Sequence, residues 1–166
     1  MSQEKIHRAL HEENRKAWNA ATEAHNSHKI DQAAYFRAGG HTLFPEEIEL
    51  LGEISGLKIA HLQCNSGQDT LSLAQRGAAV TGVDISDTAI AFAKKLSAES
   101  GIQAEFIRAD IYDWLDEQKE RRSQFDGLFS SYGVIFWLSD LETWAKGIYA
   151  ILKPGGRFIL MEFHPL

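Results

Sequence analysis

Cysteine, basic clusters and long apolar runs are scarce in this sequence, and each scarcity excludes a class of protein. The 166 residues include one cysteine, Cys64, so no disulfide framework or paired-cysteine metal motif is present. Lys and Arg number 17 against 23 Asp and Glu, a net charge of −6 without a basic cluster. Duplex nucleic acid is therefore a poor partner, because its affinity comes largely from phosphate neutralisation. No run of about 18 apolar residues indicates a membrane span, and we expect a soluble, cytoplasmic protein.

The chain is organised around residues 58–95, which read as a strand, a tight turn, a helix and a second strand. An apolar run at residues 59–62 leads into a turn at residues 63–67. A helix with an acidic first turn follows, and Gly77 ends it. The second strand, residues 79–83, ends on Asp84. This βαβ unit, with its turn and its acidic residue, is typical of nucleotide binding.

The turn and Asp84 together indicate what the ligand carries. A turn that leads into a helix N-terminus presents backbone N–H groups to an anion. Asp84 follows Asn65 at close to the ~20-residue spacing at which an acid reaches ribose hydroxyls. Nicotinamide or flavin dinucleotides and S-adenosylmethionine both combine an anion with a ribose. A dinucleotide turn needs the glycines of G-x-G-x-x-G, whereas this turn has only Gly67, which favours the single carboxylate of S-adenosylmethionine.

Residues 59–67, Ile-Ala-His-Leu-Gln-Cys-Asn-Ser-Gly, lie along the first motif of the class I S-adenosylmethionine-dependent methyltransferases, V-L-D-L-G-C-G-x-G, and the chain resembles this family. His61 stands in place of the acid and is expected to be a hydrogen-bonded core residue. Gln63 and Asn65 stand in place of glycines, and asparagine tolerates a left-handed backbone. The resemblance covers residues 45–164 through further motifs at residues 84–86, 109–111, 125–132 and 152–156. It implies an α/β, Rossmann-like three-layer αβα sandwich whose mostly parallel sheet has the strand order 3-2-1-4-5.

The resemblance also implies how S-adenosylmethionine is bound. The backbone of the turn would hold the methionine carboxylate, Asp84 the ribose hydroxyls, and Ile85 would pack on the adenine. Asp110 would accept from the adenine amine, and the Ile111 N–H would bind a ring nitrogen. The predicted cofactor-binding residues are Trp18, Gln63, Cys64, Asn65, Gly67, Asp84, Ile85, Ala109, Asp110, Ile111 and, near the methionine portion, Ser130 and Ser131. No catalytic residue and no metal ligand is predicted.

The N-terminal residues 3–26 are predicted to form a helix whose thin, alanine-rich apolar stripe needs a surface to pack on. In the resembling family such helices lie over the cofactor. We therefore expect residues 1–44 to cover the site and residues 45–166 to form the S-adenosylmethionine-binding domain. Trp18 is either part of that cover or a packing residue. His7 and His11 lack a third metal ligand nearby and are predicted to lie on a solvated helix face.

The C-terminal part contains a predicted helix and a fifth strand. Ser139 and Glu142 have the spacing of a capping box, and residues 157–163 read as a strand inside a parallel sheet. Family members continue with strands 6 and 7, which are absent here, so we expect a partial chain. The uncovered edge of the fifth strand invites pairing with another chain, and a homodimer through that edge is one way to cover it. Glu162 and His164 are the nearby candidates for a proton acceptor.

Three functions are consistent with these patterns. The leading hypothesis is methyl transfer from S-adenosylmethionine to a small-molecule acceptor, with neither nucleic acid nor membrane as a partner. The alternative is a non-catalytic cofactor-binding or partner subunit with the same fold, which Gln63, Asn65 and the missing strands support. A nicotinamide dehydrogenase is the third, and the single glycine of the turn counts against it.

Overall fold

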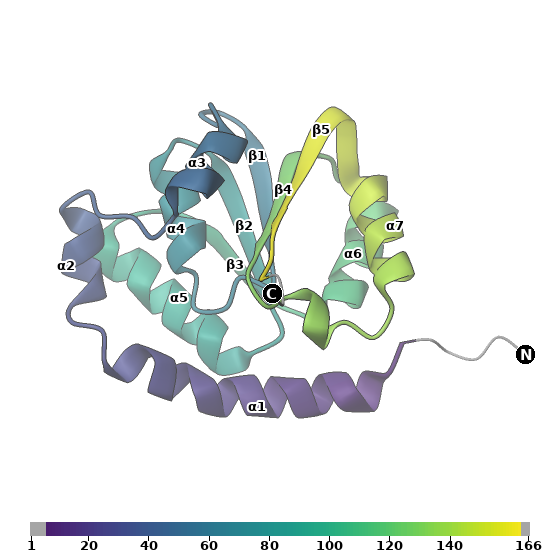
Figure 1. Cartoon of the computed structure of the whole chain (residues 1–166), viewed down its shortest axis with the longest axis horizontal. Coiled ribbons are helices and arrows are strands. Elements are labelled where there is room, and N and C mark those ends of the chain that lie inside the picture. Colours follow the sequence, from purple (N-terminus) through teal and green to yellow (C-terminus); the bar gives the residue numbers. More distant parts are fainter. Residues whose placement is uncertain (1–5, 164–166) are drawn as a thin grey trace, which may run out of the picture.

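A computed structural model describes residues 6–163, and a parallel β-sheet forms the centre of this part of the chain (Figure 1). The strands are hydrogen-bonded in the order β3-β2-β1-β4-β5, and every neighbouring pair is parallel. In chain order the strands are β1 (Lys58–Leu62), β2 (Ala79–Asp84), β3 (Glu105–Arg108), β4 (Phe125–Ser131) and β5 (Leu152–Met161). The predicted α/β fold and its strand order are confirmed.

Helices cover both faces of the sheet, which gives the three predicted layers. In Figure 1, α3, α4 and α5 lie on one side of the strands, and α6 and α7 lie on the other. The helices are α1 (Arg8–Ser27), α2 (Gln32–Arg37), α3 (Pro45–Leu51), α4 (Gln68–Gln75), α5 (Asp87–Ser100), α6 (Ile111–Glu120) and α7 (Leu141–Ile151), with a short 3-10 helix η1 (Ile135–Trp137). Among these described helices, none has the combination of length and apolar character that a bilayer-spanning helix needs.

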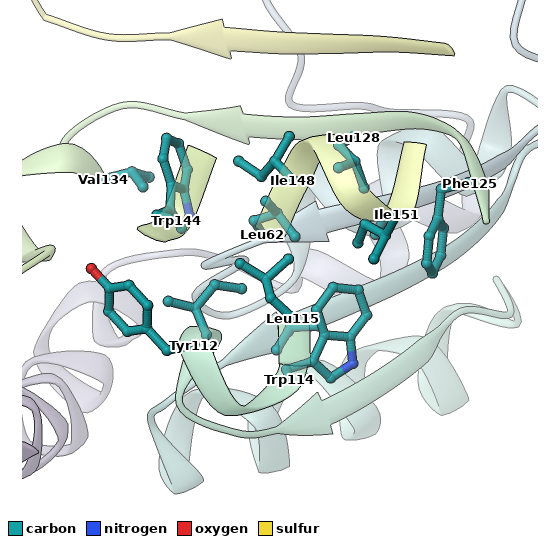
Figure 2. Close-up of a cluster of buried hydrophobic side chains, with 13 residues drawn as sticks. Leu62, Tyr112, Trp114, Leu115, Phe125, Leu128, Val134, Trp144, Ile148 and Ile151 are labelled. Atoms are coloured by element: carbon teal, nitrogen blue, oxygen red, sulfur yellow. The ribbon is translucent and has the colours of Figure 1, made fainter. Parts of the chain in front are cut away.

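Helices cover both faces of the central strands, and consecutive side chains of a strand point to opposite faces, so side chains on both faces of these strands are buried. Leu62 of β1 packs on the α6–α7 side with Trp114 and Ile148, in the cluster that Figure 2 shows. Ile59 of the same strand points to the other side and packs with Leu73 of α4. An apolar run without alternating polar residues is therefore what this position in the sheet requires.

The N-cap of helix α7 (Leu141–Ile151) lies one residue after the predicted one. Asp140, not Ser139, caps it, since an Asp140 carboxylate oxygen accepts the Thr143 N–H at 3.1 Å. The predicted Ser139–Glu142 capping box is wrong. The Ser139 hydroxyl is instead bonded to the backbone N–H of His7 and to the ring of His11. His11 belongs to an N-terminal helix, and the local sequence around Ser139 does not indicate that this helix lies beside it.

Strand β5 lies at an edge of the sheet, as predicted, but not with the predicted bounds. It begins at Leu152, directly after α7, and ends at Met161 rather than continuing to residue 163. Leu152 already pairs with Phe125, and a register irregularity follows before Gly127 pairs with Arg157. Gly155, with φ 80°, lies within this irregular stretch. The Pro-Gly-Gly segment thus belongs to the strand instead of separating it from the helix.

Helix α1 lies apart from the two helical layers. In Figure 1 it runs along the lower edge of the sheet, where the strands end, and it packs on α5. This edge is where a parallel α/β sheet binds its ligands.

Candidate functional site

A cavity of about 330 Å³ opens at the carboxyl ends of the strands. Its walls come from the segments that follow β1, β2, β3 and β4 and from one side of α1. The lining residues are His11, Asn14, Trp18, Lys29, Thr42, His61, Gln63, Cys64, Asn65, Gln68, Asp69, Val83, Asp84, Ile85, Ala109, Asp110, Ile111, Tyr112, Ser131, Tyr132, Gly133, Val134, Trp137 and Leu138. Its volume lies in the range of small-molecule sites, roughly 300–1,000 Å³.

Ten of the twelve predicted cofactor-binding residues line this cavity. The two that do not are Gly67 and Ser130. Gly67 turns toward the core, where an added Cβ would lie 2.6 Å from the Phe106 ring and 2.7 Å from the Cβ of Ala93. Ser130 is fully buried, and its hydroxyl donates to the Leu62 carbonyl at 3.3 Å. Both therefore serve the packing beneath the site, whereas Ser131, the next residue of β4, faces the cavity.

The turn after β1 has an unusual backbone. Gln63 and Asn65 have φ values of 51° and 50°, and Gly67 has 79°. The left-handed conformation costs a residue other than glycine roughly 1–2 kcal/mol, and such strain tends to persist at functional sites. The amide oxygen of Gln63 is buried and has no hydrogen-bond partner among the described residues.

Asp84, at the end of β2, is held by the backbone of two segments. One carboxylate oxygen accepts the Asn65 N–H and the other accepts the Ser86 N–H, both at 2.8 Å. Burial raises the pKa of Asp84 above its ordinary value, although backbone N–H groups partly oppose this. Each carboxylate oxygen has a second lone pair, so both can still accept a ligand hydroxyl from the cavity.

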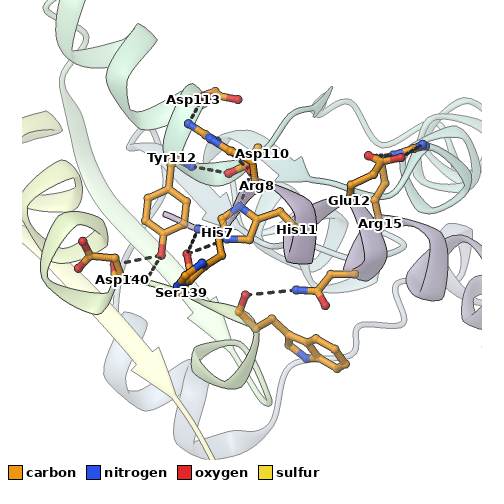
Figure 3. A network of polar contacts seen from close by, with 12 residues as sticks. His7, Arg8, His11, Glu12, Arg15, Asp110, Tyr112, Asp113, Ser139 and Asp140 are labelled. Atoms are coloured by element: carbon orange, nitrogen blue, oxygen red, sulfur yellow. Dashed lines mark hydrogen bonds and ion pairs between the residues drawn. The ribbon is translucent and has the colours of Figure 1, made fainter. Parts of the chain in front are cut away.

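Asp110, after β3, is the centre of a polar network that joins three distant segments (Figure 3). One of its oxygens accepts the Tyr112 N–H at 3.0 Å and so caps α6. The other oxygen is bonded to the His11 Nδ1 at 2.6 Å and is 3.0 Å from an Arg8 guanidinium nitrogen. The His11 Nε2 is 2.8 Å from the Ser139 hydroxyl, which also accepts the His7 N–H. Asp110 is thus fixed from both the sheet and α1.

His11 corrects one prediction. It does not lie on a solvated helix face, because it is 4% exposed and its ring stacks on Tyr112 with centroids 5.3 Å apart. Its contacts with residues about a hundred positions away could not be read from the helix alone. A weaker signal was present, since His11, Asn14 and Trp18 recur at a helical spacing and all three line the cavity.

Trp18 lies in the cavity wall, and of its two expected roles, part of the cover or a packing residue, this position fits the first. Its ring meets that of Trp137 edge-on, with centroids 5.5 Å apart, and both side chains line the cavity. The pair brings α1 against the segment after β4. Trp137 follows Tyr132 in that segment, and neither of these lining residues is among the predicted cofactor contacts.

Two residues of the first motif are buried and unreactive, and for His61 this is the predicted core position. His61 is bonded through Nδ1 to the Thr70 hydroxyl at 2.8 Å, and burial lowers its pKa to about 4. Burial likewise raises the pKa of the Cys64 thiol well above its usual value. A protonated thiol is a weak nucleophile, so Cys64 contributes shape rather than reactivity.

Glu162 does not fit the role of proton acceptor that the sequence suggested. Its carboxylate accepts the backbone N–H groups of Gly133, Val134, Ile135 and Phe163. Burial alone would raise its pKa, but these four donors outweigh it and the pKa lies below its usual range. Glu162 therefore holds the segment after β4 in place. His164, the other candidate, lies outside the described residues.

The fold and the cavity define a Rossmann-like protein with a nucleotide-type site at the strand ends. The profile of the family described as Methyltransferase domain matches residues 59–156, and the chain belongs to this family. An uncharacterized methyltransferase of Synechocystis is 28% identical over 137 residues, which are 81% of this chain and 61% of that protein. A ubiquinone biosynthesis O-methyltransferase of Pseudomonas entomophila is 28% identical over 120 residues, 70% of this chain and 50% of that protein. The chain thus spans about half to three fifths of these relatives.

Solved structures agree with this assignment. An S-adenosylmethionine dependent methyltransferase from Mesorhizobium loti matches with a TM-score of 0.56 and 26% identity over 68% of this chain and 48% of that one. The DhpI–SAH complex matches in fold, with a TM-score of 0.65 at 22% identity over 93% of this chain and 70% of that one. The predicted family and its cofactor, S-adenosylmethionine, are confirmed. Which residues contact the cofactor stays a prediction.

Proposed function

We propose that this chain transfers a methyl group from S-adenosylmethionine to a small-molecule acceptor. One observation carries the proposal: the turn after β1, Asp84 after β2 and Asp110 after β3 line a single cavity that α1 closes from outside. These are the positions at which a Rossmann-like sheet holds a nucleoside. We also propose the division expected from the sequence, with residues 1–44 as the cover and residues 45–166 as the cofactor-binding domain.

The lining residues fit the cofactor part by part. The turn amides would hold the methionine carboxylate, and the outer lone pairs of Asp84 would accept the ribose hydroxyls. Ile85 and Ile111 offer apolar surface to the adenine. Asp110, held by His11 and by its own helix, would accept the adenine amine.

Methyl transfer asks for alignment more than for acid–base chemistry. When bound, S-adenosylmethionine supplies an electrophilic methyl group on a sulfonium whose leaving group is neutral. Consistent with this, the cavity wall contributes shape and hydrogen bonds, while His61 is held neutral and Glu162 is bonded to backbone. The aromatic pair Trp18 and Trp137 would exclude water from one side of the site.

The size of the cavity and the net charge of the chain favour a small acceptor. The cavity is about 330 Å³ and is partly closed by α1, which leaves little access for a folded macromolecule. The chain has a net charge of −6, which disfavours nucleic acid as the acceptor.

The first test is binding. Calorimetry with S-adenosylmethionine, S-adenosylhomocysteine and NAD should give binding of the first two only. At about 100 times its dissociation constant a ligand should stabilise the fold by about 2.7 kcal/mol. A response to NAD alone would contradict the proposal.

The second test follows the methyl group. The chain is incubated with methyl-labelled S-adenosylmethionine and with a metabolite extract, a protein extract or total RNA, beside the Asp84→Ala variant as control. We expect protein-dependent label in the metabolite fraction. Label confined to protein or RNA would refute a small-molecule acceptor, and binding without transfer to any fraction would support the non-catalytic alternative.

A further inference from the structure

Three aromatic side chains from distant segments form a row beside the cavity. Tyr132, directly after β4, lines the cavity itself. Its ring centroid is 5.7 Å from that of Phe44, which it meets edge-on, and 5.0 Å from that of Phe163. Phe44 precedes α3 and Phe163 follows β5. This row, the aromatic rim, has no part in the cofactor contacts proposed above.

The two outer rings of the aromatic rim are exposed to solvent. Phe44 is 56% exposed and Phe163 is 66% exposed. Helix capping does not account for the ring of Phe44, because this residue is the N-cap of α3, a position that favours Ser, Thr, Asp or Asn. Neighbouring apolar side chains that stay exposed beside a cavity are typical of a binding surface.

The central residue of the rim has a backbone conformation that tyrosine seldom adopts. Tyr132 has a φ of 47°, and the end of β5 holds it there. Its N–H donates to the Met161 carbonyl at 2.7 Å, and the Glu162 carboxylate accepts the N–H groups of the next two residues. Strain of this kind gathers at functional sites. The Tyr132 hydroxyl has no hydrogen-bond partner within residues 6–163, so the backbone alone directs the ring.

The charged groups that act on Tyr132 are all acidic. Burial raises the pKa of Tyr132, and so do the carboxylates of Glu47, Glu46 and Asp69. In the described part of the chain no Lys or Arg opposes this shift. A carboxylated or phosphorylated compound stacked on this ring would meet like charge, whereas a neutral or cationic compound would not.

From these observations we propose that the aromatic rim binds the methyl acceptor, and that the acceptor is an aromatic compound without negative charge. The inference rests on the proposed function, because it names the acceptor class of the same cavity. Ser131, expected near the methionine portion of the cofactor, directly precedes Tyr132, so the rim begins beside the methyl-donating end. Aromatic rings attract one another beyond their apolar area, which a saturated ring does not share. The free Tyr132 hydroxyl can bond a polar substituent of the acceptor.

The test measures ring binding to the chain loaded with S-adenosylhomocysteine, which occupies the cofactor part of the cavity. Titrations with phenol, cyclohexanol and benzoate are followed by saturation-transfer NMR. The three probes share a six-membered ring and differ in aromaticity or charge, and phenol should bind most tightly. In Tyr132→Leu the Kd of phenol should rise about 2- to 10-fold, and its advantage over cyclohexanol should disappear.

Tyr149→Leu is the matched control, since Tyr149 is 84% exposed on α7 and lies outside the cavity wall. It should leave the affinities of all three probes unchanged. Tyr132→Leu should bind S-adenosylhomocysteine like the unmodified chain, which shows that the variant is folded. If it does not fold, Phe163→Leu, at an exposed residue of the same rim, replaces it with the same expected change.

Three NMR results would overturn the aromatic acceptor: cyclohexanol that binds as tightly as phenol, benzoate that binds more tightly, or an unchanged phenol Kd in Tyr132→Leu. A dimer in analytical ultracentrifugation that Tyr132→Leu dissociates would also overturn it, because a second copy would then cover the rim. A methyl-labelled metabolite without an aromatic ring would contradict it as well. Failure of the unmodified chain to bind S-adenosylhomocysteine would instead overturn the proposed function.

Discussion

Replacing His11 with alanine should loosen helix α1 while the sheet stays folded. The ring joins Asp110 and Ser139, at 2.6 and 2.8 Å, and stacks on Tyr112. Together with the ion pairs of Arg8 to Asp110 and Asp113, these interactions hold the N-terminal half of a helix whose apolar stripe is thin. The sheet does not depend on them, because its buried core clusters lie between the strands and helices α2 to α7.

The expected magnitude follows from the interactions that the imidazole ring makes. A hydrogen bond to a carboxylate contributes about 1.5–3 kcal/mol and one between neutral groups about 0.5–1.5 kcal/mol. Stacking of the ring adds about 0.5–1.5 kcal/mol. Arg8 still reaches Asp110 in the variant, so we expect the docking free energy of α1 to fall by about 2–4 kcal/mol. Since every 1.4 kcal/mol is about tenfold in an equilibrium constant, α1 should open about 30-fold more often or more.

Hydrogen exchange followed by mass spectrometry reports this opening segment by segment. We expect faster exchange in peptides from α1 and unchanged exchange in peptides from β1 and β4. His28→Ala, at an exposed residue beyond the end of α1, should behave like the unmodified chain. Unchanged exchange in α1 would mean that the network does not hold the helix. Equal acceleration in the sheet would mean that the network stabilises the whole fold. Either result would refute the reasoning.

Three further predictions concern the site and its support. Asp84→Asn should weaken S-adenosylhomocysteine binding about 10- to 100-fold in calorimetry, since one oxygen that accepts ligand hydroxyls is removed; unchanged affinity would contradict the ribose assignment. Because His61 has a pKa of about 4 in the fold against an ordinary 6.5, the unfolded chain binds a proton that the folded chain does not. Stability should therefore fall by about 3 kcal/mol as the pH falls through that window, and urea titrations of His61→Gln should show a flatter pH dependence. Gly67→Ala should cost about 2–4 kcal/mol in the same titrations, because the backbone has φ 79° and the new methyl would meet Phe106 and Ala93; a smaller loss would mean that α4 can shift.

The features that could be predicted from the sequence are those that local chemistry decides. Strand β4 (Phe125–Ser131) coincides with the motif at residues 125–132, which the family resemblance picked out. The Ser86 side chain that caps α5 and the proline that begins α3, Pro45, are likewise signals that local sequence carries. Asp84 could be placed at the end of β2 because the lengths of the first strand, the turn and the helix that follows it determine where the second strand ends.

The features that were missed depend on segments far apart in the chain. Ser139 has the spacing of a cap, yet its hydroxyl is taken by His11, 128 positions away. Ser130 and Ser131 are adjacent and of the same residue type. Only the orientation of β4 in the assembled sheet determines that Ser130 is buried and that Ser131 lines the cavity. Gly67 was assigned to the ligand because its motif is a ligand motif, whereas the packing of α4 on its neighbours needs it.

Helix α1 and the cofactor are predicted to contact the same two loops, those that follow β2 and β3. Docking of the helix and binding of the cofactor should therefore be coupled. Asn19 accepts the Ser86 hydroxyl at 2.7 Å and donates to Asp87 at 3.2 Å, just beyond Asp84, while His11 holds Asp110. A ligand that orders these loops therefore favours the docked helix, and a docked helix favours the ligand by the same free energy. Bound cofactor should then lower hydrogen exchange in α1 as well as in the loops. The cover is in this sense part of the binding site, although most of the helix lies outside the cavity.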